Sequence, residues 1–277
     1  GTWAEALRSD AATGMVTVPR VSGRTVLSAP RIYYVDPVLG SDANDGLGAG
    51  ASGFASLARA LEVVQGLNAN GHSVTVQLAD GTHAVSAPLV YDAGVSGQAQ
   101  VTLQGNVAAP TQVVLDGAGT VVQVVAGHLA LRGVQVQSAS TTAPAIEVRN
   151  RSTLSVEAVD FGAAPAGHIK VVSAHLYLTG DYSISGSADA HIALDLGAVA
   201  EMQGGTVSLS GTPDFPTAFF VSASCSAAGL IGVTYTGSAT GPRYLAATNG
   251  TIDTSGGGTD YLPGDVGGSK NQGGRYV

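Results

Sequence analysis

The sequence predicts an all-β fold, a parallel β-helix, and three observations support this prediction. First, a pair of apolar residues one position apart returns every 23 to 27 residues from about residue 121 to 252. Second, two more such pairs follow within each period, so one period holds three short strands with one buried face each. Third, 39 glycines and only 12% charged residues suit short strands and turns better than amphipathic helices. The pairs that begin successive periods are Val122 and Val124, Ile146 and Val148, Ile169 and Val171, Ile192 and Leu194, Phe219 and Val221, and Tyr244 and Ala246.

A fixed period of this length indicates stacked units, because one unit cannot bury its apolar face alone. Three short strands joined by bends make one coil of a parallel β-helix, and glycines fall between the apolar pairs, where bends are needed. A leucine-rich repeat would show fixed asparagines and helix-length spacers, and the sequence has neither. We therefore assign residues 31–252 to the β-helix.

The first 30 residues differ from this pattern and predict an extended arm with one turn at Thr13 and Gly14. The arm carries Trp3, the one tryptophan of the chain. No neighbouring segment is long enough to enclose a ring so near a terminus, so we expect Trp3 to dock on another protein.

One helix is predicted within the β-helix, over about residues 54–66. Ser52 is a candidate N-cap and Gly66 a stop signal. The apolar residues at helical spacing are Phe54, Leu57, Leu61 and Val64.

The loop before this helix is rich in acidic and amide side chains, which are calcium ligands in other proteins. Asp42, Asn44 and Asp45 miss the alternation of an EF-hand loop by one position. We therefore expect these residues and Asp36 to form Asx turns, and we predict no metal site. After residue 252 the pattern stops, and the glycines of residues 253–277 predict a flexible or partner-ordered tail.

Charge and composition exclude several classes of function. A net charge of −8 without clustered Lys and Arg argues against nucleic acid as a partner. The single Cys225 excludes an internal disulfide and is expected to be a small buried residue. There is no run of 18 apolar residues and no signal-peptide pattern at the first residues, so we expect no membrane insertion. No phosphate loop or dinucleotide fingerprint is present, so no cofactor is expected.

The segment around the predicted helix resembles a known family. The residues that carry the resemblance are Tyr34-Val35-Asp36, Gly40-Ser41-Asp42, Asn44-Asp45-Gly46, Phe54-Ala55-Ser56-Leu57 and Asp80-Gly81-Thr82. This order resembles the opening segment of the pectate-lyase-like right-handed β-helix superfamily, with His83 where that family usually has Tyr. The resemblance covers about residues 32–252. It implies a right-handed coil whose helix covers the open end of the first coil.

The two chain ends resemble a narrower group. The arm and the ending Gly273-Gly274-Arg275-Tyr276-Val277 are similar to features of fibre and spike proteins of bacteriophages and virus-like gene-transfer particles. This implies a virion spike or tail-fibre subunit at the particle surface, a homo-oligomer and most often a trimer. It implies attachment to other virion proteins through the arm and binding of host cell-surface polysaccharide by the β-helix.

Enzymes that resemble this fold and cut polysaccharides place two or three carboxylates on one outward face. Hydrolysis needs an acid and a base or nucleophile roughly 5 to 9.5 Å apart. The outward columns that we align hold at most one acid each, which favours a protein without catalytic activity. Asp189 and Asp214, in loops before successive coils, are the catalytic pair of the alternative, a polysaccharide depolymerase.

Three aromatic residues are candidates for contact with sugars or for an oligomer interface. The strand pattern places Tyr177 and Phe220 outward, and Phe215 lies in a loop. His168 and His191 are expected as outward neighbours about 4.8 Å apart, too few for a metal site. Outward ion pairs are expected between Glu147 and Lys170 and between Arg132 and Glu157. A face without any sugar-contacting group would instead indicate a purely structural spacer.

Overall fold

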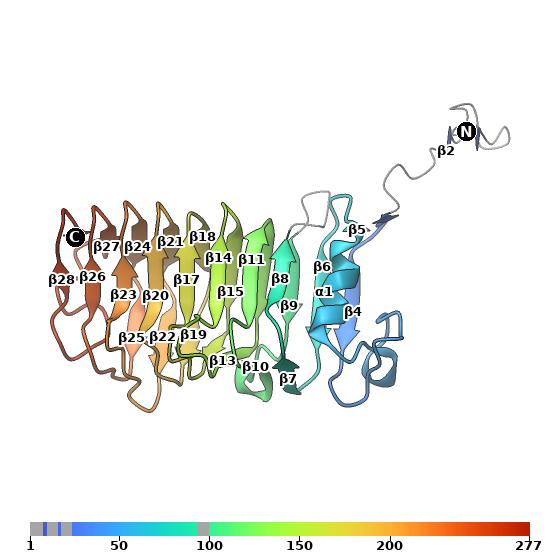
Figure 1. The fold of residues 1–277 in the computed structure, drawn as a ribbon, viewed down its shortest axis with the longest axis horizontal. Helices are drawn as coiled ribbons and strands as arrows, with labels where there is room; N and C mark the ends of the chain where they lie inside the picture. Colours follow the sequence, from blue (N-terminus) through green and yellow to red (C-terminus); the bar gives the residue numbers. More distant parts are fainter. Residues whose placement is uncertain (1–7, 10–15, 18–23, 93–99) are drawn as a thin grey trace.

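The computed structural model describes residues 8–9, 16–17, 24–92 and 100–277. Over these ranges the chain winds into a stack of about eight coils, with the N-terminal coils at one end of the stack and the C-terminal coils at the other (Figure 1). The predicted all-β parallel β-helix is confirmed. Its right-handed sense of winding stays a prediction, and Trp3 lies outside the described residues.

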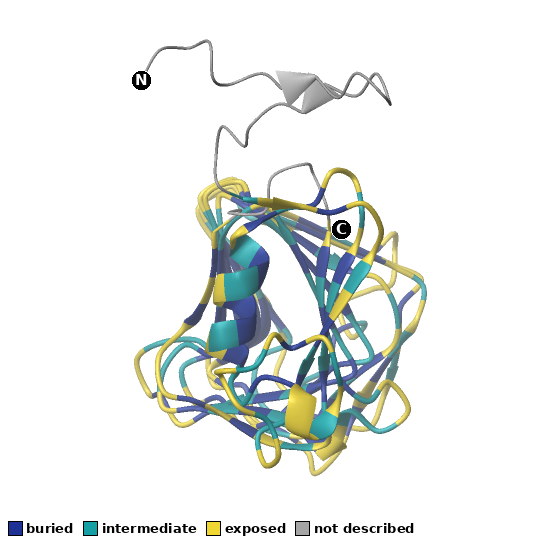
Figure 2. Cartoon of the chain, turned by 90° about the vertical axis from the view of Figure 1, so that its right-hand side faces the viewer, coloured by how far each residue is buried: buried dark blue, intermediate teal, exposed yellow. Residues whose placement is uncertain are grey.

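Three parallel sheets form the sides of the stack (Figure 2). The ten-strand sheet contains β4 (Arg31–Val35), β6 (Val74–Leu78), β9 (Val101–Gln104), β12 (His128–Arg132), β15 (Thr153–Glu157), β18 (His175–Leu178), β21 (Val199–Gln203), β24 (Ala227–Ile231), β27 (Thr251–Asp253) and β29 (Arg275–Tyr276). The seven-strand sheet contains β7 (Gly81–Val85), β10 (Val113–Gly117), β13 (Gln135–Ser138), β16 (Asp160–Phe161), β19 (Tyr182–Ile184), β22 (Thr206–Leu209) and β25 (Thr234–Thr236). The eight-strand sheet contains β8 (Leu89–Asp92), β11 (Val122–Ala126), β14 (Ile146–Arg149), β17 (Ile169–Val172), β20 (Ala190–Asp195), β23 (Ala218–Ser222), β26 (Tyr244–Ala246) and β28 (Ser269–Lys270).

Short elements complete the described chain. Two parallel strands, β3 (Thr25–Val26) and β5 (Leu67–Asn68), pair beside the first coil, and β1 (Arg8–Ser9) pairs antiparallel with β2 (Val16–Thr17). Two 3-10 turns, η2 (Gly50–Ser52) and η3 (Pro110–Gln112), lie in loops.

The interior is filled by columns, which are residues at the same position in successive coils. One column of the eight-strand sheet runs through Val122, Ile146, Ile169, Ile192 and Phe220, and each is at most 1% exposed. Burial of such a side chain stabilises the fold by roughly 1.5 to 3 kcal/mol. The alternation of apolar and polar residues that predicts the strands therefore corresponds to alternating buried and outward positions in the structure.

The bend from the eight-strand sheet into the ten-strand sheet is repeated in successive coils. Residues with φ between 48° and 78° occur there, including Gly127, Asn150, Ser173, Leu196 and Thr248. This left-handed conformation turns the chain within a few residues. It keeps the strands of the ten-strand sheet in register, so residues of equivalent sequence position align along its outer face.

The helix α1 (Leu57–Gln65) is nine residues long and contributes four buried residues to the interior. It packs against β4 and β8, and its Gln65 amide exchanges hydrogen bonds with the backbone of Val90 and Asp92 in β8. It therefore occupies the place of a strand beside the edge strand β8. The N-cap is Ser56 and not Ser52, because the Ser56 hydroxyl accepts the Arg59 N–H at 3.2 Å.

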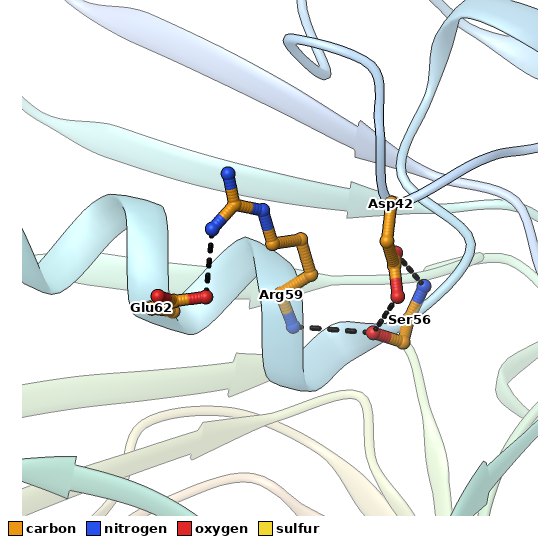
Figure 3. Close-up of polar contacts among 4 residues, drawn as sticks. All are labelled: Asp42, Ser56, Arg59 and Glu62. Carbon is orange, nitrogen blue, oxygen red and sulfur yellow. Dashed lines mark hydrogen bonds and ion pairs between the residues drawn. The ribbon is translucent and has the colours of Figure 1, made fainter.

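Asp42 supports the start of α1. Its carboxylate accepts hydrogen bonds from the backbone N–H and the hydroxyl of Ser56 (Figure 3). Asp36 and Asp45 accept backbone N–H groups two or three positions ahead, as Asx turns do. The Asn44 amide donates to two backbone carbonyls of the same loop. The side chains of this loop therefore serve its own backbone.

The Gly-rich segment 253–277 differs from the expected tail. It supplies β28 and β29, which add one strand each to the eight-strand and ten-strand sheets. The Tyr276 ring stacks on Tyr244 with centroids 3.8 Å apart. The coil pattern is hard to see here in the sequence because both strands are only two residues long.

Candidate functional site

The outer face of the ten-strand sheet carries two hollows. The first, about 230 Å³, lies over β6, β9, β12 and β15, and the second, about 360 Å³, lies over β21, β24 and β27. Polar side chains of the first hollow include Thr75, Thr102, Gln104, Arg132, Ser155, Glu157 and Thr179. The second hollow is lined by Val199, Ala200, Glu201, Gln203, Ala227, Ala228, Gly229, Ile231, Thr251 and Asp253.

Hydrogen bonds and one ion pair hold the side chains of the first hollow. The Arg132 guanidinium lies 3.1 Å from the Glu157 carboxylate, so this predicted ion pair is confirmed. Both side chains are about 40% exposed, and the pair stabilises the fold by roughly 0 to 1 kcal/mol. The Ser155 hydroxyl lies 2.7 Å from Nε2 of His128. The Arg132 Nε atom is buried and has no hydrogen-bond partner.

Tyr177 stands between the two hollows. It pairs in register with Ser155 of the first hollow and with Glu201 of the second. Its side chain is half-buried while Leu176 and Leu178 on either side are buried, so the predicted outward position is confirmed. The face thus has one aromatic ring with a hydrogen-bonding hollow on each side.

The second hollow is acidic and has a gap in its middle. Glu201, Gly229 and Asp253 follow one another in the same column. A Cβ placed on Gly229 would meet nothing within 4 Å, so the glycine leaves open space between two carboxylates. With strands about 4.8 Å apart, the Cα atoms of Glu201 and Asp253 are separated by about 10 Å.

This column is not apparent from the sequence. In the later coils the apolar pair beside it is reduced to Ala200 and Met202, and then to Ala228 and Leu230. These weak pairs gave no clear register for the residue between them. The signal that could have found the column is the regular spacing of Ser155, Tyr177 and Glu201 along the chain.

Asp189 and Asp214 are exposed, but each carboxylate is occupied by a hydroxyl of the following coil. Asp189 accepts from Thr217 at 2.7 Å, and Asp214 accepts from Thr240 at 2.6 Å. The Asp214 carbonyl accepts the N–H of Ala188, and Asp214 pairs with Thr240 of the following coil, so no pairing sets Asp214 opposite Asp189. Their contacts are those of residues that join loops between coils.

The prediction that Phe215 and Phe220 are exposed is wrong. Phe215 is 0% and Phe220 is 1% exposed. Phe220 is in register with Ile192 and Tyr244 inside the coil, one position away from the register that the sequence suggested. Phe215 packs edge-on against Phe219 at 5.3 Å between ring centroids. Neither ring can reach a ligand at the surface.

His168 and His191 are also interior residues, and both are 0% exposed. They lie at the corner between the seven-strand and eight-strand sheets, where the alternation of a straight strand no longer applies. With four aromatic neighbours they form a cluster that we name the interior stack. Its members are Phe161, His168, Tyr182, His191, Phe215 and Phe219.

The polar atoms of the interior stack satisfy one another. His168 Nε2 donates to the Gly162 carbonyl at 2.9 Å, which leaves His168 Nδ1 as an acceptor. His191 Nδ1 donates to it at 3.1 Å, and His191 Nε2 accepts the Tyr182 hydroxyl at 3.0 Å. Burial lowers the pKa of His168 to about 4 and the pKa of His191 well below its ordinary value. Both imidazoles are therefore neutral at pH 7.

Two further predictions need correction. Cys225 is exposed and not buried, because it lies in the bend that follows the eight-strand sheet, with φ at 61°. Glu147 is in register with Lys170, but its carboxylate contacts Gln123 and Arg149 instead.

Within the described residues no group of three or more His, Cys, Asp and Glu side chains is placed to hold a metal ion. In the same ranges no helix is long and apolar enough to cross a membrane.

Comparisons with known proteins give a match at the level of structure. A scan of family models and a search of curated proteins each find no match. The structure is similar to the crystal structure of Escherichia coli YbhC, with a TM-score of 0.52 and 11% identity over 88% of this chain and 77% of that chain. At this identity the similarity shows the fold alone. It supports the parallel β-helix that the sequence predicts.

Proposed function

We propose that this protein is a virion spike or tail-fibre subunit that binds host cell-surface polysaccharide on the outer face of its ten-strand sheet without cutting the chain. One observation carries the polysaccharide part of the proposal: the half-buried Tyr177 points outward between two hollows lined by hydrogen-bonding groups. An aromatic ring beside polar groups matches a sugar, which has an apolar face and a hydroxyl edge.

The dimensions of the face also fit a polymer. The column through Tyr177 runs from Thr75 to Asp253 and advances by about 4.8 Å per coil. A bound chain that runs along the coil axis would therefore meet a repeated set of polar side chains. Glu201 and Asp253 make the C-terminal half acidic, which favours neutral or amine-bearing sugars over acidic ones there.

The virion part of the proposal rests on the resemblance of the two chain ends to fibre and spike proteins. In this proposal the protein is a homo-oligomer, most often a trimer, located at the particle surface, and Trp3 docks the arm on other virion proteins. Trp3→Ala should leave the β-helix folded, as measured by circular dichroism, while incorporation into particles is lost. Normal incorporation of the variant would contradict this role of Trp3.

Co-sedimentation with host capsular or surface polysaccharide, with chain length followed over one day, tests the binding role. We expect the protein to sediment with the polymer while the chain length stays constant. Absence of binding would overturn the proposal and leave a structural spacer as the remaining account.

A depolymerase is the second candidate, and one observation favours it. Glu201 and Asp253 flank the gap at Gly229 with Cα atoms about 10 Å apart, a backbone spacing that allows their side chains to bring the carboxyl groups to the roughly 6.5 to 9.5 Å used by inverting glycosidases. Shortening of the polymer that Glu201→Gln or Asp253→Asn abolishes would establish this candidate. If the polymer is shortened, and only Asp189→Asn or Asp214→Asn abolishes this, the catalytic pair is instead the one expected from the sequence, Asp189 and Asp214.

A further inference from the structure

A serine in the wall of the first hollow is in direct contact with a histidine of the neighbouring strand. Ser155 on β15 lies in the wall of the hollow, and its hydroxyl oxygen is 2.7 Å from Nε2 of His128 on the neighbouring strand β12. A nucleophile with a base within about 2.6 to 3.2 Å is the arrangement that activates a hydroxyl for attack on a carbonyl carbon. The binding role proposed above assigns no chemical reaction to either residue.

The neighbours of His128 indicate which nitrogen carries its proton. The Gln100 amide nitrogen lies 3.3 Å from the same Nε2 atom, and an amide nitrogen can only donate. Nε2 is therefore the acceptor for both Gln100 and Ser155, and the ring proton is on Nδ1. Burial lowers the pKa of His128, so the imidazole is neutral at pH 7 and its lone pair faces the serine hydroxyl.

Two side chains with hydrogen-bond donors, Arg132 and Thr102, line the same hollow. Arg132 contacts Glu157 through Nη2, while its Nε–H is buried and has no partner. The Thr102 hydroxyl lies in the lining of the same hollow. Donors that await an oxyanion in a partly enclosed site supply a large share of the rate enhancement in acyl transfer.

We propose that Ser155 and His128 form a nucleophile–base pair that removes ester-linked acyl groups, such as O-acetyl groups, from glycans on the outer face of the ten-strand sheet. Ser155 Oγ bonds to the ester carbonyl carbon while its proton moves to His128 Nε2. The bond between the carbonyl carbon and the sugar oxygen then breaks, and that oxygen takes the proton from His128. Water attacks the acyl-serine in the same way, which releases the carboxylic acid and restores the serine.

This activity goes beyond the proposed function, because no glycosidic bond is cut and chain length stays constant. That the natural ester belongs to a glycan rests on the proposed polysaccharide binding. Cleavage of a small ester does not rest on it.

The test uses the full chain with two small probes, a fluorophosphonate that labels activated serines and p-nitrophenyl acetate as substrate. We expect the label on Ser155, located by peptide mass spectrometry. We expect the hydrolysis rate to fall at least about 100-fold in Ser155→Ala and in His128→Gln.

Matched controls are available on the same molecule. His175 occupies the column of His128 two coils further on, and Ser208 is an exposed serine of the seven-strand sheet. His175→Gln and Ser208→Ala should keep the wild-type rate.

The only charged side chains on β9, β12 and β15 besides His128 are Arg132 and Glu157. The wild-type rate should therefore fall as pH drops below the ordinary pKa of histidine, with a midpoint lowered by the burial of His128.

Each outcome decides the proposal. Absence of label from Ser155 in the folded wild-type protein would overturn it, and so would an unchanged rate in a folded Ser155→Ala variant. Because labelling is read on the wild-type protein, a variant that fails to fold does not prevent a decision. A protein that sediments with polysaccharide but carries no label at Ser155 would overturn only the esterase. A labelled protein that does not sediment would overturn only the binding role.

Discussion

The interior stack and the outer face of the ten-strand sheet contain similar residues in different surroundings. Both combine histidine, tyrosine and hydroxyl groups. In the interior stack each polar contact is made inside the protein, and His168 and His191 are fully enclosed by aromatic rings. On the outer face Tyr177 is half-buried and flanked by hollows, and the side chains of the Arg132–Glu157 ion pair are about 40% exposed. Position in the coil, and not residue type, therefore determines whether such a side chain is enclosed in the interior or lies on the outer face.

The largest loss of stability is expected from Phe215→Ala in the interior stack. Phe215 is 0% exposed and packs against the rings of Phe219 and His191. Its truncation should lower the free energy of unfolding by about 3 to 5 kcal/mol. The binding of polysaccharide per folded molecule should not change. Denaturant unfolding measures the first quantity, and co-sedimentation at a temperature where the variant is folded measures the second.

The pH dependence of stability is the second test of the interior stack. An unfolded histidine takes up a proton near pH 6.5, whereas buried His168 does so only at about pH 4. As pH falls from about 6.5 towards 4, the unfolded state binds the extra proton, so stability is lost. The loss is on the order of 3 kcal/mol for a shift of this size.

Unfolding measured at several pH values between 7.5 and 4 checks this expectation. The nearby titratable groups are His191, Tyr182 and Asp160. The double variant His168→Leu/His191→Leu should have a flatter pH dependence than the wild-type protein, and exposed His175→Gln should not. Equal slopes in all three proteins would contradict the role given to the buried imidazoles.

Tyr177→Ala is expected to have the smallest effect on the free energy of unfolding. It is expected to have a clear effect on polysaccharide binding. Loss of a half-buried ring on the outer face should change the free energy of unfolding little. Loss of a stacking contact should weaken polysaccharide binding by about 1 kcal/mol, which corresponds to roughly fivefold in the dissociation constant. Wild-type affinity in Tyr177→Ala would remove the ring from the binding site.

The sequence was sufficient to predict the coils, because strand alternation and a constant period reflect burial directly. It failed at the corners. Strand alternation, extended past the bend, predicts that His168 and His191 point outward. At the bend, however, each histidine and the isoleucine that follows it are both buried. The coil before Phe220 has extra residues, so the sequence allows either Phe219 or Phe220 to align with Ile192. In the structure Phe220 pairs with Ile192, and both phenylalanines are buried.

The candidate site was predictable only in part. Tyr177 lies between two buried leucines, so its outward position followed from the sequence. Glu201 and Asp253 follow weak apolar pairs, and their column was not identified. The contact between Ser155 and His128 joins two columns and two coils, and only the register of β12 and β15 brings these residues together.

Chemical blocking of each of the three sides of the coil tests directly whether the polysaccharide binds on the ten-strand sheet. Single cysteines would replace Thr179 on the ten-strand side, Ser208 on the seven-strand sheet and Lys170 on the eight-strand sheet. Because Cys225 is exposed, the background is Cys225→Ser. Each protein would be alkylated with a bulky maleimide before its affinity for the polysaccharide is measured.

Alkylation at residue 179 should weaken binding by at least about tenfold, a change of about 1.4 kcal/mol, while alkylation at 170 or 208 leaves binding unchanged. Loss of binding on alkylation at 170 or 208, with none at 179, would contradict the placement of the binding site on the ten-strand sheet.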